Sequence, residues 1–138
     1  MKRTPTLTVT SLLSILFFSL HFADDITRGF EPGGFKNIFG VLILAAWLYA
    51  TVTLAERRWA YVIVLLGSIL GAGVPLVHMR GAGLVGGRIA DSSGVLLWVW
   101  TLIALGATAT VSAILAARGL WGLGRTRQPT PSCSPPAR

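Results

Sequence analysis

The chain has 138 residues, of which 53% are hydrophobic and only 12% are charged, whereas ordinary soluble domains carry about 25% charged residues. This shortage of charged side chains excludes an ordinary soluble surface. The formal net charge of +7 comes from Lys and Arg residues near the ends of apolar runs, so we expect contact with the lipid bilayer and its anionic headgroups, and no nucleic-acid partner.

Four apolar runs with few charged residues are long enough to cross a membrane, because about 20 helical residues span a hydrocarbon core about 30 Å thick. We therefore predict an all-α integral membrane protein, with four transmembrane helices in one small bundle over residues 1–121. Residues 122–138 are rich in Pro, Ser, Thr and Arg and poor in large apolar side chains, which predicts a disordered cytoplasmic tail. The predicted spans cover residues 7–28, 38–55, 59–77 and 94–117.

The first apolar segment follows Met1, Lys2 and Arg3, an arrangement that secretory signal peptides share with membrane anchors. A cut after Ala23 would place His21 where signal peptidase prefers a small residue, and no A-x-A pattern lies nearby. We predict a retained membrane helix and keep cleavage of this segment as the alternative.

The distribution of positive charge predicts the orientation, because Lys and Arg in short flanking segments are retained on the cytoplasmic side. With four spans, one side carries eight such residues and the other carries four. Both termini are therefore expected in the cytoplasm, and the short, span-rich chain suits a bacterial inner membrane. The eight are Lys2, Arg3, Arg57, Arg58, Arg118, Arg125, Arg127 and Arg138, and the four are Arg28, Lys36, Arg80 and Arg88.

Aromatic residues lie near the ends of the third and fourth spans, as in the interfacial belts of membrane proteins. Trp59 and Tyr61 begin the third span, and Trp121 follows the fourth. These three residues are predicted at the cytoplasmic interface. Trp98 and Trp100 are predicted at the outer interface.

Small residues four apart let two membrane helices approach closely, and both later spans carry them. The third span has Gly67 and Gly71 at this spacing. We predict that the third and fourth spans pack together through these faces, with contact in a homo-oligomer as the alternative. The small residues of the fourth span are Ala104, Thr108, Ser112 and Ala116.

A mixed polar cluster closes the first span. His21, Asp24, Asp25 and Arg28 are separated by three, one and three residues, which places all four on one helix face. His78, at the outer end of the third span, could join this candidate ligand or proton site. Imidazole and carboxylate groups bind divalent metals, so His21, Asp24 and Asp25 are candidate metal ligands. The alternative is a solvated helix end, with Asp24 and Arg28 in an ion pair.

The rest of the sequence contains no pattern that indicates a particular enzymatic reaction. The middles of the predicted spans hold no Asp, Glu, Lys, Arg or His, which argues against a charge-coupled pump. No pattern indicates a catalytic nucleophile, so we expect neither an enzyme nor a cofactor. The leading interpretation is an accessory, assembly or sensing component of the membrane, with a homo-oligomer or another membrane protein as partner. An oligomeric small-solute transporter or channel subunit, and an outer-face metal-binding protein or enzyme, stay open as alternatives.

Overall fold

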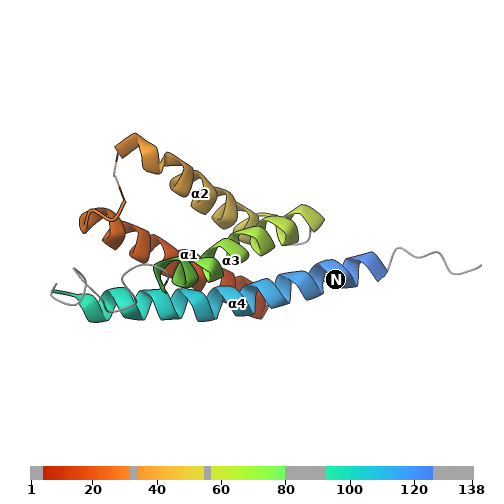
Figure 1. Ribbon diagram of the computed structural model, residues 1–138. Helices are drawn as coiled ribbons and strands as arrows, with labels where there is room; N and C mark the ends of the chain where they lie inside the picture. The colour runs from red at the N-terminus through yellow and green to blue at the C-terminus, as the bar shows by residue number, and fades with distance from the viewer. Residues whose placement is uncertain (1–4, 32–33, 55–56, 80–92, 126–138) are drawn as a thin grey trace, which may run out of the picture.

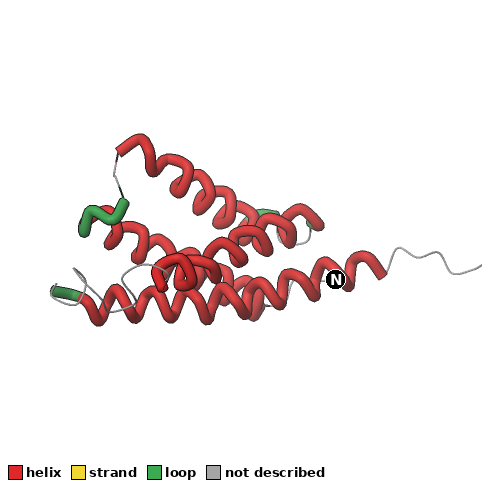
Figure 2. The backbone as a smooth tube through the Cα atoms, viewed as in Figure 1, coloured by secondary structure: helices red, strands yellow, loops and turns green. Residues whose placement is uncertain are grey.

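The computed structural model of the chain describes residues 5–31, 34–54, 57–79 and 93–125. These residues form four α-helices and one short 3-10 helix (Figure 1), and no strand occurs among them (Figure 2). The all-α fold expected from the hydropathy pattern is therefore confirmed. The elements are α1 (Pro5–Thr27), η1 (Gly34–Asn37), α2 (Ile38–Val52), α3 (Arg58–Met79) and α4 (Val95–Arg125).

All four segments are long and apolar enough to cross a membrane, when η1 is counted together with α2. Most of their large apolar side chains lie on the outside of the bundle, where a soluble protein would carry polar groups. Lipid would satisfy these apolar surfaces, and each helix bonds its own backbone groups, as the bilayer requires. The protein is thus a multi-pass helical membrane protein.

Helix α4 makes the two most extensive helix–helix contacts in the bundle. It packs most extensively against α3 and next against α1, whereas α2 makes smaller contacts with α3 and α1. In Figure 1, α2 diverges from α1 toward its amino-terminal end. The buried core that holds the helices together includes Leu7, Ile15, Trp47, Ala50, Tyr61, Val64 and Ala116.

Close packing of α3 depends on its glycines. A side chain at Gly71 would meet Leu105 Cδ1 of α4 at 3.2 Å and Ala109 Cβ at 3.3 Å. A side chain at Gly67 would instead overlap the ring of Trp47, at 2.5 Å from Cδ2. The missing side chain at Gly71 therefore allows α4 to pack closely against α3, whereas that at Gly67 makes room for Trp47 of α2.

Buried hydroxyl groups add polar links between the helices. Ser68 of α3 donates a hydrogen bond to Ser112 of α4 at 2.9 Å. The indole of Trp47 on α2 donates to Ser11 Oγ of α1 at 2.9 Å, and Ser11 also bonds Thr51 at 2.8 Å. Every one of these groups would be costly to leave unpaired in a membrane interior.

Two of the expected interfacial aromatic residues are buried instead. Trp59 and Trp100 are exposed, but Tyr61 is 5% exposed and Trp98 is fully buried. The prediction of belt positions was wrong for these two, because residues two apart point about 200° from each other around a helix of 3.6 residues per turn. One member of each pair faces outward, so the other faces the bundle.

Helix α4 also extends beyond the predicted span end at residue 117 and ends at Arg125. Leu115, Leu120 and Leu123 pack against the core cluster, which keeps the last turns attached to the bundle. Residues 122–125 thus belong to α4 and not to the predicted tail. The rest of that tail, residues 126–138, lies outside the described residues.

Candidate metal centre

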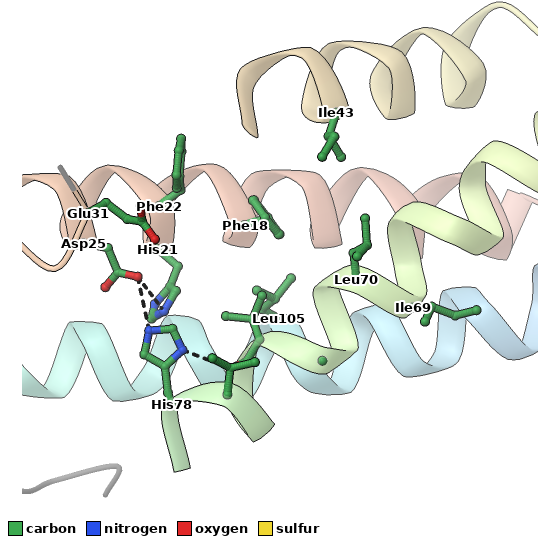
Figure 3. A pocket seen from close by; sticks show the side chains of 13 residues that line it. Phe18, His21, Phe22, Asp25, Glu31, Ile43, Ile69, Leu70, His78 and Leu105 are labelled. Atoms are coloured by element: carbon green, nitrogen blue, oxygen red, sulfur yellow. Dashed lines mark hydrogen bonds and ion pairs between the residues drawn. The ribbon is translucent and has the colours of Figure 1, made fainter. Parts of the chain in front are cut away.

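Three titratable side chains meet where the carboxyl ends of α1 and α3 come beside the start of α4 (Figure 3). His21 Nε2 lies 3.5 Å from Asp25 Oδ2, and His78 Nε2 lies 3.2 Å from the same oxygen. The potential ligand atoms of the three residues lie within 4.8 Å of one another. We name His21, Asp25 and His78 the histidine–aspartate centre.

The end of α1 fixes the position of Asp25. Gly29 adopts φ +73°, a left-handed conformation that glycine takes without strain. The amide of Gly29 donates to the carbonyl of Ile26, and that of Phe30 donates to the carbonyl of Asp25. This pair of bonds is a Schellman motif, which ends a helix by satisfying its last carbonyls. The backbone of Asp25 is thereby held in the last turn of α1.

His78 makes two hydrogen bonds that together require a shared proton. Its Nδ1 lies 2.9 Å from the carbonyl oxygen of Val74, which only accepts, so Nδ1 carries a proton. Its Nε2 lies 3.2 Å from Asp25 Oδ2, so a second proton lies on one of these two atoms. A metal ion bound to Nε2 would take the place of that second proton.

His21 has one nitrogen bonded and one left over. Thr101 donates its hydroxyl proton to the carbonyl of Trp98 at 3.0 Å, so its oxygen accepts from His21 Nδ1 at 3.3 Å. In the neutral imidazole, His21 Nε2 is then an unprotonated acceptor, and it is buried without a hydrogen-bond partner. Because the residue is only 2% exposed, bulk water does not compensate this lone pair.

The second oxygen of Asp25 has its own partner. Trp98 Nε1 donates to Asp25 Oδ1 at 2.8 Å, which leaves Oδ2 directed at the two histidines. The indole ring of Trp98 also lies 5.2 Å from the ring of His21 and 5.3 Å from that of His78. The carboxylate is therefore held in one orientation within an aromatic wall.

The neighbouring acid Asp24 belongs to a different interaction. Arg28 Nε donates to Asp24 Oδ2 at 2.8 Å, and Arg28 Nη2 donates to the carbonyl of Ser93 at 3.0 Å. The bond from Arg28 to Ser93 links the end of α1 to the segment before α4. Of the five candidate residues, the structure thus brings together His21, Asp25 and His78, and it directs Asp24 and Arg28 elsewhere.

Two of the three separations between ligand atoms are close to those around a tetrahedral metal ion. Zinc bonds of about 2.0–2.2 Å to nitrogen and oxygen separate neighbouring ligand atoms by roughly 3.3–3.6 Å. The separations from Asp25 Oδ2 are 3.2 Å to His78 Nε2 and 3.5 Å to His21 Nε2, and all three ligand atoms lie within 4.8 Å of one another. Metal-binding histidines also donate their other N–H group to an oxygen, which fixes the ring. His78 does so to Val74 and His21 to Thr101.

A cavity of about 440 Å³ adjoins the centre, and all three of its residues line it. The remaining wall is mostly apolar and comes from all four helices (Figure 3). Its volume lies within the range of small-molecule sites, about 300–1,000 Å³. The centre therefore faces open space on one side and protein on the others.

The sequence did not identify Trp98 and Thr101 as partners of the centre. Both lie on α4, distant in the chain from the residues they contact, and neither has a charge that stands out in an apolar run. The spacing of three residues between them, which places both on one helix face, is the only available signal. No family model, curated protein or solved structure matches this chain, so its function is argued from the histidine–aspartate centre itself.

Proposed function

We propose that this protein binds one divalent transition-metal ion, of the zinc class, through His21 Nε2, Asp25 Oδ2 and His78 Nε2. The observation that carries the proposal is the buried, unpartnered Nε2 of His21, directed toward a carboxylate oxygen 3.5 Å away. Two lone pairs that face each other at this distance repel. A cation between them turns the repulsion into two bonds.

The surroundings support a metal ion over a purely structural hydrogen-bonded cluster. Most buried polar atoms have a donor or acceptor as partner, and among the described residues His21 Nε2 has no hydrogen-bond partner. The outer atoms of all three residues are already bonded, to Thr101, Trp98 and Val74. Of the inner atoms, His21 Nε2 has no hydrogen bond, and the proton shared by His78 Nε2 and Asp25 Oδ2 is the one that a bound ion would replace.

The donor set favours a particular group of metals. Two imidazoles and one carboxylate suit zinc, iron, copper and nickel better than calcium or magnesium, which prefer oxygen ligands. Three protein ligands also leave one tetrahedral position for water or a small ligand. Such a site resembles exchangeable or catalytic zinc sites more than closed structural ones.

The location supports a role as a sensing or accessory component of the membrane. The ligands come from α1 and α3, and their outer partners come from α3 and α4. Metal binding would therefore tie three helices together at one end of the bundle. With both termini in the cytoplasm, as the charge distribution predicts, that end faces the outside of the cell.

The test is zinc binding to the purified full-length protein in lipid nanodiscs, measured by isothermal titration calorimetry. The parent protein is expected to bind one zinc ion per chain. Asp25→Asn keeps the shape and an oxygen acceptor for Trp98 but removes the anionic ligand, so affinity should fall by about tenfold or more.

The matched control is Asp24→Asn, which makes the same chemical change one residue earlier on an acid that pairs with Arg28. Its zinc affinity should equal that of the parent protein. Absence of saturable binding in the parent, or an equal loss of affinity in both variants, would refute the proposal.

A further inference from the structure

The cavity beside the histidine–aspartate centre combines one polar end with a long apolar wall. We propose that it holds a single-chain amphiphile with a carboxylate head, such as a fatty acid, whose head occupies the open position of the bound metal. This inference rests on the metal site proposed above and names the ligand class of the same site.

The apolar wall is built for a hydrocarbon chain. Phe18 and Phe22 of α1, Ile43 of α2 and Leu105 of α4 line the cavity. Ile43 is exposed on the outer surface of the bundle, which lipid chains would cover. A ligand dissolved in the bilayer could therefore enter from the side, without crossing water.

The wall contributed by α3 continues the same surface. Ile69, Leu70 and Val77 line the cavity, and each is more than half exposed. In a membrane these side chains contact acyl chains, so cavity and bilayer form one continuous apolar phase.

The volume of the cavity is close to that of one acyl chain of medium length. A cavity of about 440 Å³ accommodates roughly fifteen groups of the size of a water molecule, at about 30 Å³ each. A fatty acid of medium length has about that many heavy atoms. A two-chain phospholipid has several times more.

The charge of the metal with its three protein ligands favours an anionic head group. A divalent ion, one carboxylate from Asp25 and two neutral imidazoles leave one unit of positive charge on the three-ligand site, which attracts an anionic head group. A carboxylate head would neutralise it and supply the fourth ligand. Glu31 also lines the cavity, but it is not among the residues whose ligand atoms lie within 4.8 Å of one another, so it leaves the fourth position open to the head group.

Gly73 provides a variant that closes the cavity without disturbing the centre. It lines the cavity, and a side chain built on it meets no atom within 4 Å. Gly73→Leu should therefore fill space that the ligand needs while the protein still folds. Gly124 also has open space around it but does not line the cavity, so Gly124→Leu is the matched control.

The experiment follows carboxyl-labelled dodecanoate by carbon NMR in phosphatidylcholine nanodiscs that contain the full-length protein. With zinc present, the parent protein and Gly124→Leu should show a bound carboxylate signal, displaced by unlabelled dodecanoate but not by dodecanol. Gly73→Leu should weaken dodecanoate binding by about tenfold or more and retain the zinc affinity of the parent. Removal of zinc from the parent protein should abolish the bound signal.

Each contrary result has a distinct meaning. Zinc binding without a bound carboxylate signal, or a signal indifferent to Gly73→Leu, would overturn the fatty-acid inference and leave the metal site intact. Tighter binding of dodecyl phosphate would overturn the assignment of a carboxylate head. A parent protein that binds no zinc would remove the metal site, and the ligand inference with it.

Discussion

Asp24 and Asp25 are adjacent, identical in chemistry and different in environment. Asp25 is 5% exposed, accepts from Trp98 and faces both histidines. Asp24 lies one helical step away and pairs with Arg28 at the half-buried edge of α1. A rotation of about 100° per residue around the helix separates the two roles. The carboxylate of Asp25 thus lies where a metal cation would stabilise it, whereas the carboxylate of Asp24 is already paired with Arg28.

Trp98 positions the carboxylate of Asp25 through its hydrogen bond to Oδ1. Trp98→Phe keeps an aromatic ring in the wall but removes this donor, so Oδ2 should be less well oriented toward the ion. Loss of such an outer partner typically lowers metal affinity by about 10–100-fold. Zinc titration of the variant by calorimetry measures the effect.

The control for this variant is Trp100→Phe, at an exposed position two residues later in α4. It should leave zinc affinity unchanged. If Trp98→Phe and Trp100→Phe bind zinc as tightly as the parent protein, the carboxylate does not depend on its indole partner, and our account of the centre's geometry is wrong.

Among the helices, α3 packs against both α2 and α4 and also lines the cavity. Its small residues admit Trp47 of α2 at Gly67 and the side chains of α4 at Gly71. The same helix then runs through Pro75, whose ring packs against Gly106 of α4. The close approach of α3 and α4 brings His78 to the end of α1, so helix packing and the centre depend on each other.

Gly71→Ile should destabilise this packing, because its side chain would overlap Leu105 and Ala109. Overpacking of this kind costs about 1–3 kcal/mol. A lower thermal midpoint in detergent is the expected result. Gly73→Ile is the matched control, since it adds the same side chain on the same helix where there is open space.

An unchanged midpoint for Gly71→Ile would mean that α3 and α4 separate easily at this point, contrary to the contacts described here. A midpoint that falls equally in both variants would point to a general effect of isoleucine in α3. Only a selective loss at position 71 agrees with the packing.

At the scale of the whole molecule, the sequence predicted the helices and the packing of α3 on α4, but not how three helices meet at the histidine–aspartate centre. Uncharged runs of sufficient length determine a membrane helix with little help from tertiary structure, so the four-helix fold followed from hydropathy. The inward face of each helix depends on its neighbours, which is why Tyr61 and Trp98 were misassigned to the interface. His21 and Asp25 were recognisable from their spacing, but their meeting with His78 and Trp98 requires three helices to pack.

The charge bias also makes a prediction about the whole molecule. A reporter fused after Arg138 should report the cytoplasm, because eight Lys and Arg residues flank that side. One inserted between Gly83 and Gly87, in a segment outside the described residues, should report the opposite side. Reporters on the same side would contradict a four-span topology.

Zinc-edge X-ray absorption of the zinc-loaded protein tests the proposed metal site most directly, because it counts the imidazoles around the metal. We expect two imidazoles and oxygen ligands at tetrahedral distances of about 2.0–2.2 Å in the parent protein, and one imidazole in His78→Gln. A zinc environment without imidazole, or one that His78→Gln leaves unchanged, would contradict the proposed site.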